Sequence, residues 1–228
     1  MSFRLAERLG PADLVTLSNA VLGVAAMAVA LTGRPDLVAR LILLAAVADG
    51  LDGILARRYG GTAVGPTLDA LADVISFGAA PAVFVLTVAR AGMAPVGSEP
   101  AGYVVASAVA AGLVALSLVR AAMYTVHFPE SVRRPGIQNT LLASILAAAY
   151  LSGLTAPGAL LAVAAVLAVL QVAPISYPKL LARDALAMGV VQFGAILAPR
   201  VGGRALPRGL LIAALAYMVL APWFYWGK

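Results

Sequence analysis

Long apolar stretches, separated by short breaks rich in glycine and proline, run along the whole chain. A helix needs roughly 20 apolar residues to cross about 30 Å of hydrocarbon, so these stretches predict membrane-spanning helices. Breaks such as TGRPD, RRYGGTAVGP and APRVGGRALPRG are typical of turns. The predicted spans are residues 13–31, 37–57, 67–89, 103–126, 137–151, 158–172, 180–198 and 210–226.

This pattern predicts an all-α fold: a polytopic transmembrane helical bundle with six core helices plus one or two C-terminal spans. Residues 1–178 are expected to form the transmembrane core and residues 179–228 a C-terminal transmembrane extension of the same membrane domain. The number of C-terminal spans stays open, because segment 180–198 begins with Arg183 and Asp184. The alanine and glycine in nearly every span predict close helix packing.

Composition agrees with an integral membrane protein, because 62% of the residues are hydrophobic and only 11% are charged. The chain has no cysteine, which excludes disulfide and thiolate chemistry, and its single histidine argues against a histidine-based zinc site. The net charge of +6 comes mostly from arginines near segment ends, where they can meet anionic lipid headgroups. We therefore expect membrane lipids as partners and no nucleic acid.

The basic residues of the short loops predict the orientation, because such residues gather on the cytoplasmic side. With the N-terminus inside, the cytoplasmic face collects Arg4, Arg8, Arg57, Arg58, Arg133, Arg134, Lys179 and Arg183. Arg34 and Arg90 lie opposite, and Arg200, Arg204 and Arg208 join them if segment 180–198 crosses fully. This predicts a multi-pass protein of the cell membrane.

Four of the ten acidic residues lie within one short stretch, as Asp49, Asp52, Asp69 and Asp73. Spacings of three and four residues place each pair on one helix face, and the break between them is short enough to bring the faces together. An unpaired carboxylate at bilayer depth costs at least about 2.5 to 3.5 kcal/mol, so a compensating cation is expected. Carboxylate oxygens suit Mg²⁺, Mn²⁺ or Ca²⁺, and two divalent cations would offset four negative charges.

The residues around the aspartates fit a phosphate-bearing substrate at the cytoplasmic interface. Gly53 and Gly65 remove side chains where a ligand could approach the backbone, and Ala56 keeps the next turn small. Arg57 offers a forked cation suited to phosphate oxygens. Metals and an arginine around a pyrophosphate favour phosphoryl transfer.

These residues resemble the signature of the CDP-alcohol phosphotransferases, D-x-x-D-G-x-x-A-R, then seven or eight residues, then G-x-x-x-D-x-x-x-D. Every fixed position is present, as Asp49, Asp52, Gly53, Ala56, Arg57, Gly65, Asp69 and Asp73, with seven residues in the gap. The stretches LDALADVISFGAAPA, TLSNAVLG and ISYPKLL are similar to the phosphatidylserine synthase branch and its archaetidylserine synthase members. RPGIQNTLLAS replaces that branch's glycine-leucine-proline stretch, and AAMY follows Arg120 where a second arginine is expected.

The resemblance implies transfer of a phosphatidyl or archaetidyl group from a CDP-activated lipid to the hydroxyl of L-serine, releasing CMP. It implies two divalent cations, Mg²⁺ or Mn²⁺, held by Asp49, Asp52, Asp69 and Asp73, with Asp73 also the base for the hydroxyl. It further implies a homodimer and contacts from the motif's Gly53, Ala56, Arg57 and Gly65 to CDP.

Other polar residues are weaker candidates, each with a plainer structural interpretation. Thr16 and Asn19 either reach the nucleotide or make hydrogen bonds between helices. Arg120 either binds an anionic group of a substrate or snorkels to the interface. Gln138 and Asn139 either line an acceptor pocket or are polar residues at a helix start.

The sequence leaves two alternatives to serine transfer open. The first keeps the chemistry but uses glycerol phosphate or inositol phosphate as acceptor. The second, from another class, is a cation-coupled transporter in which the aspartates form an ion path. The sequence leaves open the lipid tails and whether the reaction passes through a covalent lipid–enzyme intermediate.

Overall fold

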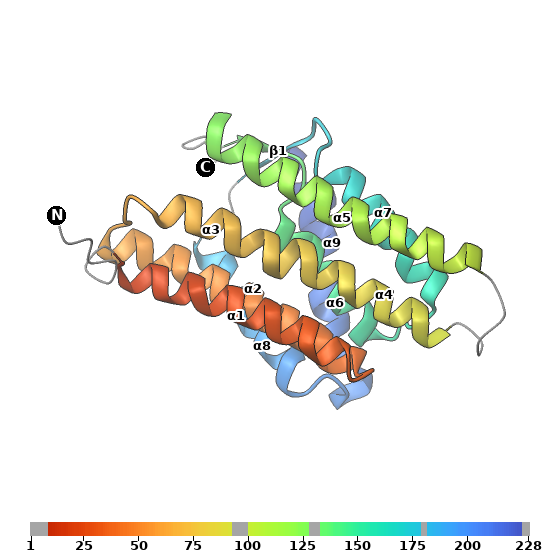
Figure 1. The fold of residues 1–228 in the computed structure, drawn as a ribbon. Helices are drawn as coiled ribbons and strands as arrows, with labels where there is room; N and C mark the ends of the chain where they lie inside the picture. The colour runs from red at the N-terminus through yellow and green to blue at the C-terminus, as the bar shows by residue number, and fades with distance from the viewer. Residues whose placement is uncertain (1–8, 93–99, 128–132, 179–181, 225–228) are drawn as a thin grey trace.

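The computed structural model describes residues 9–92, 100–127, 133–178 and 182–224, and 84% of it is helical (Figure 1). The all-α class is therefore confirmed. The elements in chain order are α1 (Pro11–Ala30), α2 (Pro35–Tyr59), α3 (Gly65–Asp73), a π-helical segment η2 (Val74–Ala79), α4 (Ala80–Gly92), α5 (Pro100–His127), β1 (Arg133–Pro135), α6 (Asn139–Ser152), α7 (Pro157–Leu170), β2 (Ser176–Pro178), α8 (Ala182–Leu197), a short 3₁₀ turn η3 (Val201–Gly203) and α9 (Ala205–Phe224).

Proline and glycine set several helix boundaries. Pro11, Pro35 and Pro157 open α1, α2 and α7 at the first helical turn, where the missing N–H costs no helical hydrogen bond. Gly153 ends α6 in the left-handed conformation, with φ of 115°, which glycine adopts without a Cβ clash. The breaks read from the sequence are therefore real helix ends.

The helices form one bundle around α6. In Figure 1 the continuous rod of α3, η2 and α4 runs between α1 and α5, and α2 lies along α1. Most of α6 is buried, and it packs against α2, α7 and α9. Large side chains such as Phe77, Phe84, Ile42 and Leu146 are fully buried in the core.

Glycines allow the closest helix crossings, which confirms the packing predicted from the small residues. A Cβ added to Gly23 of α1 would lie 2.5 Å from Ser76 Oγ and 2.8 Å from Ser76 Cα. A Cβ on Gly78 of η2 would lie 2.9 Å from Ser117 Cβ of α5. The π-helical segment therefore packs closely against both α1 and α5.

Within the described residues, four helical segments are long and apolar enough to cross a membrane: Pro11–Ala30, Gly65–Gly92, Gly102–Val126 and Val201–Phe224. The protein is therefore membrane-embedded. Helix α2 has 25 residues but carries six charged side chains, namely Asp36, Arg40, Asp49, Asp52, Arg57 and Arg58. Helices α6 and α7 have 14 residues each, or about 21 Å. The predicted count of six core spans is not confirmed.

Helix α8 carries the described part of segment 180–198, from Ala182 to Leu197. It leaves β2 and runs along α2, where Gln192 Nε2 donates a hydrogen bond of 2.8 Å to the Leu43 carbonyl. Its far end places Arg200 and Arg204 beside Asp36, at the start of α2. These arginines therefore lie at the opposite end of the bundle from the α2–α3 turn. The side chains of Arg183 and Asp184 and all of Lys179 lie outside the described residues.

The structure contains a short antiparallel ribbon that the sequence did not predict. Strands β1 and β2 pair Arg133 with Pro178, Arg134 with Tyr177 and Pro135 with Ser176. Three-residue strands rich in proline and arginine carry no period-two hydrophobic pattern that would predict them. The ribbon joins the loop before α6 to the loop before α8.

Candidate active site

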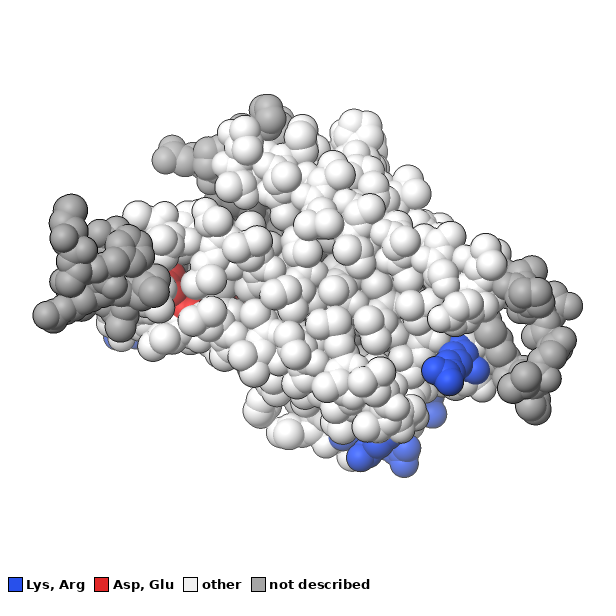
Figure 2. Space-filling model, in the orientation of Figure 1, with Lys and Arg blue, Asp and Glu red and all other residues white. Residues whose placement is uncertain are grey.

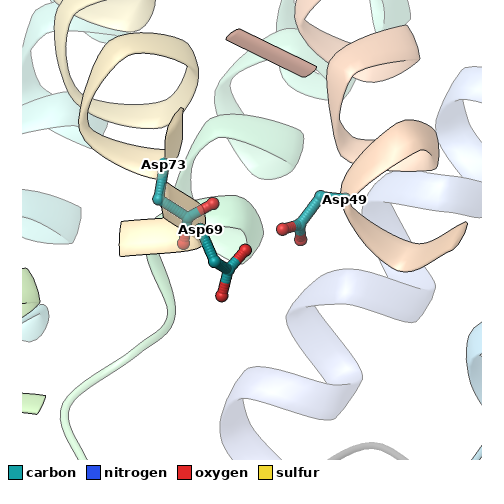
Figure 3. A group of neighbouring side chains, drawn as sticks. All are labelled: Asp49, Asp69 and Asp73. Carbon is teal, nitrogen blue, oxygen red and sulfur yellow. The ribbon is translucent and has the colours of Figure 1, made fainter. Parts of the chain in front are cut away.

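Three motif carboxylates meet between α2 and α3. One oxygen each from Asp49, Asp69 and Asp73 lie within 4.8 Å of one another, and Figure 3 shows Asp69 and Asp73 of α3 facing Asp49 of α2. The four-residue spacing of Asp69 and Asp73 puts them on one face of α3. Two oxygens bound to one cation at 2.0 to 2.6 Å lie no more than about 4 to 5 Å apart, so the cluster has the dimensions of a cation site.

The fourth motif aspartate, Asp52, lies outside this group of three. It is 6% exposed, and its Oδ2 accepts a hydrogen bond of 2.6 Å from Thr16 Oγ1 of α1. Its charge still acts on Asp69. The structure therefore brings together three of the four predicted metal ligands and holds the fourth beside them through α1.

Two of the three carboxylates, Asp49 and Asp73, have few partners among the described residues, which fits a divalent cation. Asp49 Oδ2 accepts a hydrogen bond of 3.0 Å from Thr140 Oγ1, whereas Asp73 Oδ1 is buried without a hydrogen-bond partner. Within the part of the chain that the structure describes, neither Asp49 nor Asp73 forms an ion pair. Carboxylates this close repel one another, and hard oxygen ligands are those that Mg²⁺ and Mn²⁺ prefer.

A hydrogen-bond network fixes the turn between α2 and α3. Asp13 Oδ2 accepts hydrogen bonds from Gly10 N at 2.7 Å and Thr62 Oγ1 at 2.9 Å, and Gly65 N donates to Thr62 Oγ1 at 3.0 Å. A Cβ on Gly65 would lie 3.2 Å from Asp13 Oδ1. Gly65 thus packs closely against Asp13 at the start of α3, a contact that carries no signal in the sequence. Asp13 itself was also missed.

Gly53 and Arg57 share one face of α2, as their spacing predicts. A Cβ on Gly53 would lie 3.6 Å from Arg57 Nη1, so the arginine folds back over the glycine. Arg57 is exposed, and Ala56 is half-buried beside it. This leaves an open cationic surface next to the carboxylates, where a phosphate could lie.

The π-helical segment begins directly after Asp73. The Ala80 N–H bonds to the Ile75 carbonyl, five residues back, so one extra residue is accommodated within the rod. Such segments occur mostly as local bulges in α-helices, often at functional sites. Here Ser76 Oγ donates a hydrogen bond of 2.8 Å to the Asn19 carbonyl, which ties the bulge to α1.

Thr16 makes a direct hydrogen bond between helices, whereas the Asn19 side chain makes none. Asn19 is fully buried, and both polar atoms of its amide lack a hydrogen-bond partner. A fully buried amide does not open to the nucleotide in this conformation. The partner of Thr16 in this hydrogen bond is the motif residue Asp52.

Arg120 lies beside the aspartates from α5. It is 7% exposed, its guanidinium lies 4.2 Å from the centre of the Tyr124 ring, and its charge acts favourably on Asp73. Because it is buried within the bundle, it does not snorkel. It lines a cavity of about 190 Å³, the Arg120 cavity, which is bordered by Val119, Arg120, Met123, Tyr124, Pro135, Gln171 and Val172.

A buried polar network borders the Arg120 cavity. Gln171 Nε2 donates to Ser117 Oγ at 3.1 Å and to Asn139 Oδ1 at 2.9 Å, while Gln171 Oε1 has no hydrogen-bond partner. Asn139 is not among the residues that line the cavity, and its hydrogen bond to Gln171 links it to that lining. Gln138 precedes α6 and makes no capping hydrogen bond with its side chain. Gln171 and Ser117 carried no signal in the sequence, because each is a single polar residue in an apolar stretch.

Comparison with known proteins agrees with this geometry. The sequence pattern of the CDP-alcohol phosphatidyltransferases matches residues 10–173, which contain the whole aspartate motif. The chain belongs to the CDP-alcohol phosphatidyltransferase family. The family resemblance seen in the sequence is therefore confirmed.

Relatives within this family carry serine-specific names. The chain is 38% identical over 80 residues to an archaetidylserine synthase of Methanothermobacter thermautotrophicus, covering 34% of each chain. It is 40% identical over 88 residues to a CDP-diacylglycerol–serine O-phosphatidyltransferase of Mycobacterium leprae, covering 38% of this chain and 29% of that one. The protein of that name from Saccharomyces cerevisiae is 38% identical over 94 residues, 38% of this chain and 34% of the relative. The matches thus span about a third of these relatives' length.

Proposed function

We propose that this protein is a membrane-embedded transferase that moves a phosphatidyl or archaetidyl group from a CDP-activated lipid to the hydroxyl of L-serine and releases CMP. The observation that carries the proposal is the convergence of Asp49, Asp69 and Asp73 within 4.8 Å, in a chain whose family pattern covers the same residues. The serine-specific names of the relatives support the choice of acceptor.

The aspartates would hold two divalent cations, Mg²⁺ or Mn²⁺. Asp49, Asp69 and Asp73 form the described cluster, and Asp52 joins them by a change of side-chain rotamer or through water. When bound, the cations neutralise the charge of the donor pyrophosphate and of the departing CMP. The protein then has to position the donor, orient the acceptor and move one proton.

The donor would lie over the face of α2 that carries Gly53 and Arg57. The exposed Arg57 guanidinium can pair with two phosphate oxygens, and Gly53 and Ala56 leave room for the nucleotide. Gly65 contributes by letting α3 begin close to Asp13, which holds the α2–α3 turn in place. The hydrogen-bonded turn holds α2 and α3 in position relative to each other, and with them the two aspartate pairs, before the donor binds.

Asp73 is the proposed base. Its Oδ1 has no hydrogen-bond partner, so an oxygen remains available to accept the serine hydroxyl proton. The hydroxyl oxygen attacks the lipid-bearing phosphorus and forms the new P–O bond. The bond from that phosphorus to the bridging oxygen breaks, its electron pair leaves with CMP, and the proton remains on Asp73 until water removes it.

The Arg120 cavity supports serine over acceptors that carry their own phosphate. Its described lining contains one cation, Arg120, among mainly apolar residues. One guanidinium can pair with the single carboxylate of serine, whereas a phosphate monoester carries up to two charges. Loss of Arg120 should therefore raise the KM for serine more than the KM for the CDP-lipid.

The decisive experiment measures CMP release by the purified protein with a CDP-lipid, Mg²⁺ or Mn²⁺, and one acceptor at a time. We expect release with L-serine and background levels with glycerol phosphate, with inositol phosphate or with no acceptor. Release with a phosphorylated acceptor alone would replace serine by that acceptor. No acceptor-dependent CMP at all would favour the cation-coupled transporter.

The same assay separates two reaction routes and two donors. Labelled CMP that exchanges into the CDP-lipid in the absence of serine would show a covalent lipid–enzyme intermediate, whereas direct displacement gives no exchange. Parallel assays with CDP-diacylglycerol and CDP-archaeol identify the lipid tails. Arg120→Gln, assayed alongside with both substrates varied, tests the acceptor assignment through the ratio of the two KM changes.

Three further properties belong to the proposal. The aspartates face the cytoplasm, the protein forms a homodimer, and residues 179–228 extend the transmembrane core of residues 1–178.

Because the chain has no cysteine, single-cysteine variants can test the orientation. An impermeant maleimide should label Thr32→Cys in intact cells and Tyr59→Cys only after permeabilisation, since these exposed residues lie just before the start of α2 and at its end. The reverse pattern would place the aspartates outside.

A further inference from the structure

A second charged cavity lies at the end of the bundle opposite the aspartates. It has a volume of about 130 Å³, and we name it the Arg204 cavity; its lining residues are Asp36, Arg40, Tyr150, Leu151, Thr155, Pro199, Arg200 and Arg204. Asp36 and Asp49 are about 20 Å apart along α2 at 1.5 Å per residue. In Figure 1 the α1–α2 turn and the α8–α9 link meet at the lower right, and Figure 2 shows Lys and Arg atoms gathered there.

The charges of this cavity are unbalanced. Three arginines face one acid, and the Arg40–Asp36 pair is long, at 3.9 Å. Arg40 Nε is buried without a hydrogen-bond partner. Within the described ranges, Arg200 and Arg204 form no hydrogen bond or ion pair. Several guanidinium N–H donors therefore surround one small cavity and have few hydrogen-bond acceptors among the described residues.

The backbone holds Arg204 in this position at a cost. Its φ is 70°, and among the described residues it is the one residue other than glycine with positive φ. Such a conformation is strained for an arginine, and glycine or asparagine would relieve the strain. A Cβ on Gly153 would lie 2.6 Å from Arg204 Nη1, so the glycine that ends α6 also makes room for the guanidinium. Strain that places a charged group in a cavity points to a binding role.

We propose that the Arg204 cavity binds the phosphate group of an anionic membrane phospholipid. Guanidinium groups pair with phosphate oxygens in a forked geometry, and a net excess of two positive charges suits a phosphate. The cavity lies where α1 ends, α2 begins and α9 begins, at the depth of the headgroups for helices that cross the bilayer. A bound anion also explains why arginines gather at an end that the positive-inside pattern leaves poor in them.

The test uses the full-length protein in a neutral detergent and follows its thermal unfolding midpoint. Three additions are compared: dioctanoyl phosphatidylglycerol, dioctanoyl phosphatidylcholine and inorganic phosphate. We expect a saturable rise with phosphatidylglycerol and little change with the zwitterionic lipid. A rise of the same size with inorganic phosphate at equal concentration would overturn the lipid assignment and leave a free-phosphate site. No saturable rise with either anion would overturn the site.

Variants separate a built site from general surface charge. Arg204→Asn removes the guanidinium and favours the backbone conformation at this position, so the fold should be retained. We expect it, and Arg40→Gln, to bind phosphatidylglycerol about tenfold or more weakly. The matched control is Arg208→Gln, which removes an exposed arginine one turn away that does not line the cavity. Equal weakening in the control and in Arg204→Asn would show nonspecific attraction and refute the proposal.

Discussion

Thr16 Oγ1 of α1 donates a hydrogen bond of 2.6 Å to Asp52 Oδ2 of α2, and both residues are buried. This bond fixes one motif aspartate through a helix that supplies none of the four. It also explains why Asp52 lies apart from the other three carboxylates. The first helix is therefore part of the site's architecture, and its contribution can be measured separately from metal binding.

Thr16→Val keeps the shape of the side chain and removes the donor. Because the buried Asp52 then loses a hydrogen bond, we expect a loss of stability of about 1.5 to 3 kcal/mol and a lower rate of CMP release. Unfolding in denaturant and the serine-dependent assay measure the two effects. Thr16→Ser retains the hydroxyl and should behave like the wild type. If Thr16→Val equals Thr16→Ser in both assays, the hydrogen bond has no such role.

Asp73→Asn tests the proposed base. An amide cannot accept the hydroxyl proton as a carboxylate does, so turnover should fall by about 10²-fold or more. Binding of the CDP-lipid, measured directly by calorimetry in detergent, should change much less than turnover. Turnover within a few-fold of the wild type would remove Asp73 from this role. An equal loss of binding and turnover would show that it acts through the donor site instead.

Divalent cations should stabilise the protein through the aspartate cluster. Mg²⁺ or Mn²⁺ at a hundred times its Kd adds about 2.7 kcal/mol to the free energy of unfolding, and EDTA should remove that increment. The same titration of Asp69→Asn should give a smaller increment, because one of the three clustered carboxylates is lost. Thermal unfolding with Ca²⁺ and Na⁺ added in parallel reports the selectivity. An unchanged increment in Asp69→Asn would place the cation elsewhere.

Gly23→Ala tests the crossing of α1 with the π-helical segment. The new Cβ would lie 2.8 Å from the Ser76 Cα, so backbone has to move, and we expect a loss of stability of about 1 to 3 kcal/mol. Gly112→Ala is the matched control within a helix. Apart from its chain neighbours and its own helix backbone, no heavy atom of the described residues lies within 4 Å of its added Cβ, and alanine favours helix by about 1 kcal/mol. Chemical unfolding of the two variants should therefore shift in opposite directions.

The parts of the site that the sequence predicts are those set by local helix geometry. Asp69 and Asp73 are four residues apart, and this spacing alone puts them on one face. The short break before Gly65 predicts that this face meets Asp49. Thr140 is different, because it is 91 residues from Asp49 and is a common polar residue at a helix start. Its contact depends on how α6 packs in the bundle, which no local pattern encodes.

Long-range packing also explains the features that the sequence did not predict. Gly65 lies close to Asp13, 52 positions earlier in the chain, and no local pattern indicates that contact. The β1–β2 ribbon pairs segments that lack a strand pattern. Helix α8 leads to Arg200 and Arg204 beside Asp36, an outcome that the sequence left open because loop charge is only one of several influences on topology.

The π-helical segment has a consequence for any shortening of the third rod. Each α-helical residue advances the chain by about 100° around the axis, and the wide turn between Val74 and Ala79 takes up one extra residue without changing the direction of the helix on either side. Deleting one residue there should therefore restore regular geometry and leave Asp69 and Asp73 facing Asp49, whereas a deletion elsewhere in the rod would rotate them away. The wide turn thus lets one continuous helix hold an extra residue and still direct its apolar residues into the bundle core and its two aspartates toward Asp49.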